Sequence, residues 1–346
     1  MPPARASRLG LGAAVAAALS CLPGGGEAQG VTDFYRGASL KLIISSGAGG
    51  GYDAYSRMLA RHIGHHIPGR PAIVTQNMPG AGSLVAINYV YNVAPRDGSV
   101  IADSDSTMPF YNLLDGQNAK FDPFRLNWLG SVGRQAGICI AWHSSPFKTL
   151  DDVMQRPMRV SGTGAQSWRT TMPRLYNLTA GTKFEVVTGY GTTEAFLALE
   201  RGEVDGTCVD YSTLEATRPD WLRDRKVTLI VQYGLELRGG LAGVPLGLER
   251  VKDPVDRGAM ELLLSQQLAG RPYLMPPDVP GDRLAALRAA FDTTMMDEAF
   301  LSDAQRSRLL IDPMTADQME ALFRRAYASP QAVIARAKEL LKRAGR

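Results

Sequence analysis

The chain has 346 residues, of which 45% are hydrophobic and 21% are charged, and its formal net charge at pH 7 is +4. This is an ordinary globular composition, and the length is large for one hydrophobic core, which predicts two lobes. The charge is mild and no basic run is interleaved with aromatic residues, so the sequence argues against a nucleic-acid partner.

Residues 1–28 are predicted to be a signal peptide. Arg5 and Arg8 precede the short apolar stretch 9–19, and the small residues Gly26 and Ala28 follow at the positions that a signal peptidase reads. The stretch is too short for a stable membrane anchor, and no later segment reaches about 18 uninterrupted apolar residues. We therefore expect export to the periplasm. Lipidation of Cys21 is the alternative, and it is less favoured because the residue three places before this cysteine is not leucine.

The main motif of the mature chain is a strand, a glycine turn and a helix. Residues 40–44 are a hydrophobic strand, 45–51 form a turn with four glycines in five positions, and 52–60 have a helical pattern. Glycines allow sharp turns, and the first N–H groups of a helix have no partner within it. Together with the positive end of the helix dipole, they favour an anion such as a carboxylate or phosphate. A glycine turn of this kind is also a common simple connection.

The rest of the chain alternates strands and helices. Strands are expected at 72–75 and 99–102, then in a second series at 136–141, 158–161, 184–188, 205–209 and 227–233. Such alternation predicts mostly parallel sheets that bind ligands at the carboxyl ends of their strands. A second glycine turn at 161–167 again lies between a strand and a helix. Two turns that favour anions, in separate lobes, predict a ligand held in the cleft between them.

The predicted division places residues 29–130 and 251–346 in lobe 1 and residues 131–250 in lobe 2. The hinge crossings are expected near 130 and 235–255. The C-terminal third is predicted to be helical and to pack on the first lobe, with Asp282 as the N-cap of a helix over 283–296 and further helices at 317–327 and 331–343.

Two cysteines remain in the mature chain, Cys139 and Cys208. Export permits a disulfide between them. Free buried thiols are favoured instead, because the sequence does not give the Cα separation that pairing requires. His62 and His66 have the spacing of a metal pair on one helix face, but this helix is ending and its dipole explains imidazoles there. No metal and no cofactor are predicted.

Seven motifs then follow one another in a characteristic order. They are the first turn with Asp53 and Arg57, and the segments 77–82, 94–98, 121–123, 147–150, 161–164 and 202–205. Their order and spacing resemble those of the tripartite tricarboxylate transporter (TTT) solute-binding proteins, the Bug/TctC-like periplasmic family, over nearly the whole mature chain.

This resemblance implies an α/β fold of two lobes, the type II-like clamshell of periplasmic binding proteins, with each lobe a mostly parallel sheet flanked by helices. It also implies a monomer that binds a small organic carboxylate without turnover and delivers it to membrane permease subunits. In the family, backbone amides and hydroxyls of the two turns hold the ligand carboxylates, often through waters.

The chain departs from the family pattern at three places. The first turn opens with residues 45–48 where many relatives have prolines. Ala165 and Trp168 replace a hydroxyl residue and a histidine, and Gly189-Tyr190 replaces Tyr-Lys. These changes remove a hydroxyl, an imidazole and a cation, and they add an indole that stacks on rings or donates its N–H. They favour a mono- or dicarboxylate, aromatic ones included, over a citrate-like ligand.

The predicted ligand-binding residues come from both turns and from the ends of neighbouring strands. Asp53 is equally explained as a complement of the helix dipole or a partner of Arg57, and Trp168 is equally explained as lobe core. Asp103 and Asp105 suit either local turns or a ligand hydroxyl or amine. The predicted set is Ser46, Gly47, Ala48, Gly49, Gly50, Gly51, Tyr52, Asp53, Gly82, Asp105, Ser106, Ser161, Thr163, Gly164, Ala165, Ser167, Trp168, Tyr190 and Asp210.

Enzyme functions are disfavoured by the motifs. The first turn resembles a dinucleotide fingerprint, but Tyr52 stands at the third glycine position and no acid follows the second strand. There is no P-loop and no nucleophile elbow. Two alternatives stay open at this point: a ligand-sensing subunit for a receptor kinase and, with weaker support, an exported hydrolase. The sequence does not distinguish a permease partner from a receptor.

Overall fold

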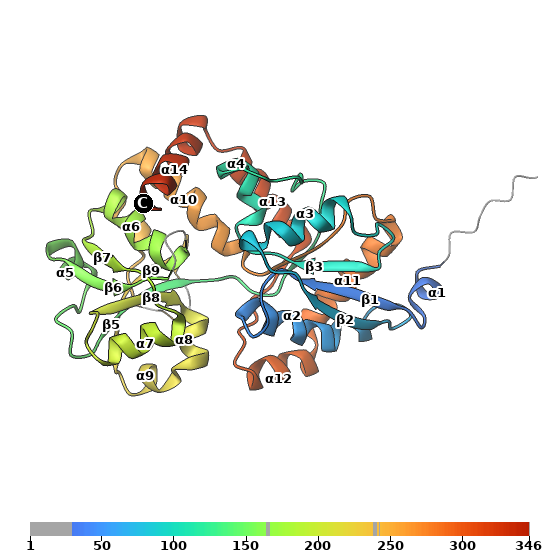
Figure 1. The fold of residues 1–346 in the computed structure, drawn as a ribbon, viewed down its shortest axis with the longest axis horizontal. Helices are drawn as coiled ribbons and strands as arrows, with labels where there is room; N and C mark the ends of the chain where they lie inside the picture. Colours follow the sequence, from blue (N-terminus) through green and yellow to red (C-terminus); the bar gives the residue numbers. More distant parts are fainter. Residues whose placement is uncertain (1–29, 164–166, 238–240, 242, 346) are drawn as a thin grey trace, which may run out of the picture.

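The computed structural model describes residues 30–163, 167–237, 241 and 243–345. It has two α/β lobes, each built on its own sheet and flanked by helices (Figure 1). The two-lobed α/β clamshell predicted from the sequence is confirmed. The predicted signal peptide lies outside the described residues. Within them, no helix combines the length and the apolar character that crossing a membrane requires.

The sheet of the first lobe has the strand order β11-β4-β10-β3-β1-β2 in the described residues. Strand β1 pairs in parallel with β2 and β3, whereas β10 runs antiparallel between β3 and β4. The strands are β1 (Ser39–Ile44), β2 (Ala72–Asn77), β3 (Val100–Asp103), β4 (Asn127–Ser131), β10 (Pro272–Met275) and β11 (Met314–Thr315).

The sheet of the second lobe has the order β7-β6-β8-β5-β9 in the same described part of the chain. Strand β6 pairs in parallel with β7 and β8, and β5 runs antiparallel between β8 and β9. The strands are β5 (Gly137–Trp142), β6 (Met158–Ser161), β7 (Phe184–Val187), β8 (Gly206–Asp210) and β9 (Val227–Tyr233).

Both sheets are therefore mixed, and the expectation of mostly parallel sheets holds only for their βαβ parts. The reason lies where the chain enters each lobe. Gly137 begins β5 opposite Asp210, the last residue of β8, and Tyr273 of β10 pairs with Asp103, the last residue of β3. An entering strand that starts beside the carboxyl ends of its neighbours must run antiparallel to them.

Helices cover both sheets, and the four predicted at 52–60, 283–296, 317–327 and 331–343 are present to within two residues at each end. In the first lobe, α2 packs on β1 and β2 and contacts α12, while α11 and α13 pack on β4. These helices are α1 (Val31–Tyr35), α2 (Gly51–His62), α3 (Leu84–Asn92), α4 (Tyr111–Leu114), α11 (Gly281–Met296), α12 (Glu298–Arg306) and α13 (Ala316–Tyr327). Helix α11 begins two residues earlier than expected, so Pro280 and not Asp282 is its N-cap.

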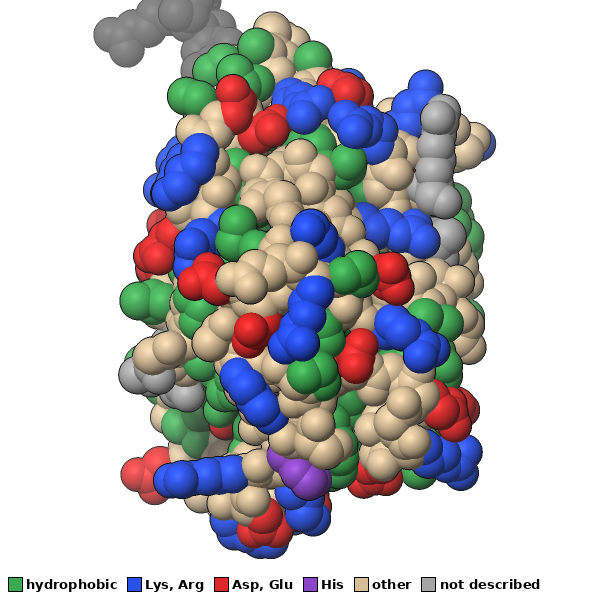
Figure 2. Space-filling view, turned by 90° about the vertical axis from the view of Figure 1, so that its left-hand side faces the viewer, with side chains coloured by type: hydrophobic (Ala, Val, Ile, Leu, Met, Phe, Trp, Pro, Cys, Tyr) green, Lys and Arg blue, Asp and Glu red, His purple; other side chains and the backbone are tan. Residues whose placement is uncertain are grey.

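The remaining helices surround the second sheet or lie beside it. The C-terminal helix α14 packs against α6 and α10 (Figure 1). These helices are α5 (Leu150–Gln155), α6 (Trp168–Ala180), α7 (Thr192–Glu200), α8 (Tyr211–Thr217), α9 (Pro219–Arg223), α10 (Pro254–Ala269) and α14 (Gln331–Ala344). On the outer face of this lobe, basic and acidic side chains are interspersed (Figure 2).

Cys139 and Cys208 form a disulfide, which corrects the expectation of free thiols. The two residues lie directly opposite each other in the antiparallel β5–β8 pair, with their Cα atoms 4.0 Å apart. The sequence shows two apolar strands but not their register, and the register is what brings the two sulfur atoms together. Both cysteines are fully buried.

Candidate functional site

The first-lobe turn, residues 45–51, lies at the carboxyl edge of the parallel strands. Ile44 at the end of β1 pairs with Asn77 at the end of β2. Residues 47–51 are all exposed, and helix α2 starts at Gly51 with Gly50 as its N-cap, a residue that has no side chain to cap the first N–H groups. An exposed and uncapped helix start is suited to an anion.

Asp53 holds this turn in shape. Its carboxylate accepts hydrogen bonds from the N–H of Gly49, from Nε of Arg57 and from Nδ2 of Asn77, each at 2.9 Å. The bond from Arg57 is the main reason that the pKa of Asp53 falls to about 2. Asn77 also donates to the carbonyl of Ser46 at 2.9 Å. The ion pair between Asp53 and Arg57 that the sequence suggested is therefore present. The carboxylate oxygens of Asp53 point into the turn.

Gly49 is the residue of this turn with a left-handed backbone. Its φ is +81°, whereas Gly50 has φ −83° and ψ 173°, values open to any residue. A Cβ built on Gly49 meets no atom within 4 Å, so a substitution there would strain the backbone and not the packing. The glycine requirement is thus at Gly49.

A second loop supports the turn from the side. Ala81, Gly82 and Ser83 all have left-handed backbones, with φ of 45°, 60° and 79°. The hydroxyl of Ser83 donates to Ser45 Oγ at 2.8 Å and accepts from the N–H of Asp105 at 3.0 Å. Through these two hydrogen bonds, Ser83 links the loops that follow β1, β2 and β3. Such strained backbone concentrates at binding sites.

The predicted residues after β3 mainly stabilise their own loop. Asp105 Oδ1 accepts from the N–H and the hydroxyl of Thr107, at 2.9 and 2.6 Å. The N–H of Ser106 donates to the hydroxyl of Tyr52 at 3.2 Å, and that hydroxyl donates to the carbonyl of Gly270, also at 3.2 Å. Tyr52 therefore connects the start of α2 with the segment that enters β10.

The second-lobe turn, residues 161–167, uses its hydroxyls internally. Ser161 is 1% exposed and donates to Thr207 Oγ1 at 2.7 Å. Thr163 donates to Ser167, which donates to Thr170 Oγ1 at 3.1 Å. The half-buried Tyr190 donates its N–H to the carbonyl of Gly162 at 3.1 Å. Gly164 and Ala165 lie outside the described residues.

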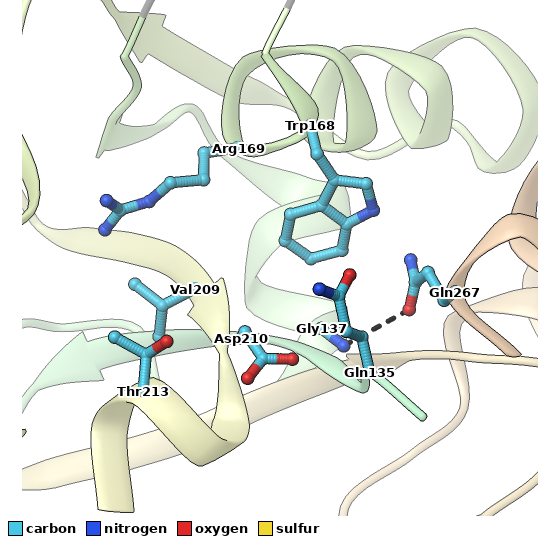
Figure 3. A pocket seen from close by; sticks show the side chains of 8 residues that line it. All are labelled: Gln135, Gly137, Trp168, Arg169, Val209, Asp210, Thr213 and Gln267. Atoms are coloured by element: carbon cyan, nitrogen blue, oxygen red, sulfur yellow. Dashed lines mark hydrogen bonds between the residues drawn. The ribbon is translucent and has the colours of Figure 1, made fainter. Parts of the chain in front are cut away.

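A pocket of about 170 Å³ opens beside this turn. It is smaller than sites for drug-sized ligands, which measure roughly 300–1,000 Å³. Trp168 and Arg169 project into it from the start of α6, with Asp210 and Thr213 opposite (Figure 3). The full lining is Gln135, Gly137, Trp168, Arg169, Val209, Asp210, Thr213 and Gln267. Of the predicted residues, the pocket brings together Trp168 and Asp210.

The Trp168 ring is positioned by Gly137 and Gln267. A Cβ on Gly137 would lie 1.8 Å from the outer edge of the indole, so this glycine leaves the space that the ring occupies. In one amide orientation, Gln267 accepts from Trp168 Nε1 at 2.7 Å and donates to the Tyr233 carbonyl at 2.8 Å. In the other, it accepts from the N–H of Gly137 at 3.3 Å (Figure 3). Trp168 is half-buried, and its ring lines the pocket.

Arg169 was not among the residues predicted from the sequence. Its Nε donates to the carbonyl of Cys208 at 3.0 Å, and burial lowers the pKa of its guanidinium. A cation in a partly buried pocket attracts a carboxylate strongly because water screens it little. In the sequence, the one sign that pointed to Arg169 as a ligand-binding residue was its position next to Trp168 at the helix start. This sign was weak, because neighbouring residues on a helix point in different directions. Asp210 across the pocket accepts from the N–H of Ala136 at 3.2 Å and from the hydroxyl of Ser212.

Two histidines, one at the end of α2 and one just beyond it, contact α12 and its N-cap. His62 Nε2 lies 3.0 Å from Asp303, and His66 Nε2 lies 2.7 Å from Asp297, both in or next to α12. No group of three or more potential metal ligands occurs among the described residues. These imidazoles help to fix α12 against α2.

Comparison with known proteins gives matches at the level of structure. No family model matches the sequence, and no curated protein matches it significantly. A TctC solute-binding protein from Polaromonas, solved without ligand, is 18% identical, with 89% of this chain and 99% of that chain covered and a TM-score of 0.68.

Two further structures come from Rhodopseudomonas palustris. A protein solved with adipate is 17% identical, with 89% and 97% of the two chains covered and a TM-score of 0.61. MatC with bound malate is 18% identical, with 88% and 99% covered and a TM-score of 0.60. The chain thus has the fold of the TctC- and Bug-type periplasmic solute-binding proteins, as its motifs indicated.

Proposed function

We propose that this protein is an extracytoplasmic solute-binding protein that captures a small organic carboxylate between its two lobes. The observation that carries the proposal is the pocket at the start of α6, where Arg169 and the Trp168 ring face the same small space. The shared fold supports it, because two structures with that fold contain a dicarboxylate, adipate or malate.

The chemistry of the site fits a ligand with few charges. Arg169 would pair with a carboxylate, and the indole would cover an apolar or aromatic part of the ligand. The carboxylate of Asp210 on the opposite wall would repel a ligand with several negative charges and accept a hydrogen bond from a ligand hydroxyl or amine. In the first lobe, the uncapped start of α2 would hold a carboxylate through backbone N–H groups.

The proposed cellular role is delivery of the bound carboxylate to the permease subunits of a tripartite tricarboxylate-type transporter. This role rests on the order of the motifs and on the predicted signal peptide at 1–28. The signal peptide would direct the protein to the periplasm. A role without catalysis is supported by the missing catalytic motifs and by neighbours that are solute-binding proteins.

A thermal-shift screen of the mature chain against mono-, di- and aromatic carboxylates tests the proposal. A ligand that binds only the native state at 100 times its Kd stabilises it by about 2.7 kcal/mol. We expect at least one carboxylate to raise Tm, calorimetry to give one site per chain, and NMR to show the ligand chemically unchanged. A panel in which no carboxylate raises Tm would contradict the proposal, and product formation would favour the hydrolase.

Ligand binding should also close the two lobes. A ligand held from both sides binds the closed form better and shifts the population toward it. Small-angle scattering with a saturating ligand should therefore give a smaller radius of gyration than without it. Equal radii would contradict closure about the two segments that cross between the lobes.

A further inference from the structure

Arg271 lies where the chain crosses between the lobes. Its N–H donates to Ser131 Oγ at 3.0 Å, and its carbonyl accepts from the N–H of Val132 at 3.3 Å. The adjacent Gly270 has φ +59°, and a Cβ there would lie 1.9 Å from the carbonyl oxygen of Gly133. The crossing from β4 to β5 and the crossing from α10 to β10 therefore touch at this residue.

The guanidinium of Arg271 is buried. The residue is 7% exposed, and its carbon Cζ lies 4.1 Å from the centre of the Tyr55 ring. Within the described part of the chain, its Nε has no hydrogen-bond partner and no carboxylate forms an ion pair with it. A cation removed from water costs several kcal/mol when it is not paired, so its position calls for a partner anion.

The nearby carboxylates are engaged elsewhere. Asp103 accepts from the N–H of Ser45 at 2.6 Å and from the hydroxyl of Ser56 at 2.5 Å. Asp210 accepts from Ala136 and Ser212. Neither lies within ion-pair distance of Arg271, and the charge is left for a group from outside the described chain.

Arg271 also faces the start of α2. Burial raises the pKa of the Tyr52 and Tyr55 hydroxyls, and the positive charge of Arg271 opposes the increase in both. The two tyrosines belong to the first turns of α2, and Tyr52 donates to the carbonyl of Gly270, the residue before Arg271. The positive end of the helix dipole and the guanidinium thus act on one region, which makes it favourable for an anion.

We propose that Arg271 is a ligand-binding residue whose guanidinium pairs with a carboxylate of the solute held between the lobes. This inference rests on the proposed function and adds a third element to it, since the contact comes from the lobe crossing and not from either turn. An arginine fork binds a carboxylate through two parallel N–H groups. Because both crossings meet at this residue, the ligand would contact the segments about which the lobes move.

Calorimetric titration with the carboxylate that stabilises the wild type in the screen tests this role. Arg271→Gln should weaken binding about 10- to 100-fold, as expected for loss of a hydrogen-bonded charge. Arg271→Lys should weaken it less, because the charge stays but the fork is lost.

Arg283→Gln is the matched control. Arg283 also stacks on an aromatic ring, with Cζ 3.6 Å from the centre of Phe34, and its Nε is also buried without a hydrogen bond. It lies in the first turn of α11, where its Nη1 donates to the carbonyl of Asp97 at 2.6 Å. Its replacement should leave the ligand affinity unchanged.

A folded Arg271→Gln variant that binds as tightly as the wild type would overturn the inference and leave the proposed function intact. A wild type that binds no carboxylate would overturn both. If Arg271→Gln does not fold, NMR of the wild type decides. The Arg271 Nε–H signal, assigned by its loss in Arg271→Lys, should shift on addition of the same carboxylate, and an unchanged signal would overturn the inference.

Discussion

The first-lobe turn and the second-lobe turn share one local pattern, a strand followed by a turn and a helix, but they differ in what they present to the cleft. In the first, Asp53 and Asn77 hold the loop in shape, and the exposed groups are backbone N–H groups at the start of α2. In the second, Thr163 and Ser167 bond to each other, and the side chains of Trp168 and Arg169 face the pocket.

This difference teaches that a glycine-rich turn does not by itself say which groups bind. Backbone amides tolerate many anions, whereas an indole and a guanidinium select by shape and charge. We therefore expect the first lobe to supply general affinity for a carboxylate and the second lobe to supply selectivity. The following experiments separate the two contributions, from the largest expected effect to the smallest.

Reduction of the disulfide should have the largest effect and should act on the second lobe. The bond closes a separation of 69 residues between β5 and β8, for which loop-closure entropy predicts a loss of about 4 kcal/mol in the free energy of unfolding. Urea denaturation of a Cys139→Ser/Cys208→Ser double variant measures it. Hydrogen exchange should accelerate in β5 and β8 but not in β1 or β2, and equal acceleration in both lobes would contradict a lobe-specific role.

Arg169→Gln should abolish the selectivity of the second lobe. Loss of a charged hydrogen-bond donor predicts about 1.5–3 kcal/mol of lost binding energy, or roughly 10- to 150-fold. Calorimetry with the identified carboxylate measures this. Arg174→Gln is the control on the same helix, because Arg174 donates to the carbonyl of Ala344 and does not line the pocket. Equal affinities of the two variants would place the ligand elsewhere.

Two glycine variants test the backbone role of the first lobe. Gly49→Val should cost about 1–3 kcal/mol of stability and weaken ligand binding, since φ is +81° there. Gly50→Ala should be tolerated, because φ is −83° and the nearest atom to its Cβ, the Gly47 carbonyl oxygen, is 3.6 Å away. Circular dichroism and calorimetry compare the pair. Undiminished binding by a folded Gly49→Val would mean that the turn is only a connection.

The smallest expected effect is the pH dependence due to Asp53. Its pKa is lowered from 3.8 to about 2 in the folded state, so its stabilisation is present above about pH 4 and is lost as the pH falls toward 2. The expected contribution is about 1–2 kcal/mol. Urea midpoints measured between pH 2 and 6 should fall more steeply for the wild type than for Asp53→Asn. Parallel curves would show that the turn does not depend on this carboxylate.

Much of the fold is readable from the sequence because it depends on local patterns. The strands at 158–161 and 227–233 have their predicted bounds. Strands β4, β10 and β11 were not predicted. They are five, four and two residues long, and they pair with one another only in antiparallel fashion.

The candidate site was only partly predictable. The two turns were found because glycines between a strand and a helix leave a local signal. Trp168 was found through the family pattern, and Asp210 follows the predicted strand at 205–209. Arg169 and Arg271 were missed, since neither belongs to a turn motif. Both arginines are candidates because of their burial and their surroundings in the fold. Residues distant in sequence determine that burial and those surroundings.

The sequence by itself determined the two-lobed α/β architecture, the strand–turn–helix units and their order, because hydrophobic periodicity and glycine placement act over a few residues. Only the tertiary structure decided the strand register that joins Cys139 to Cys208, the antiparallel direction of the entering strands, and the burial of Arg271 at the lobe crossing. These features depend on contacts between segments far apart in the chain, and no local pattern of residues encodes which segments meet.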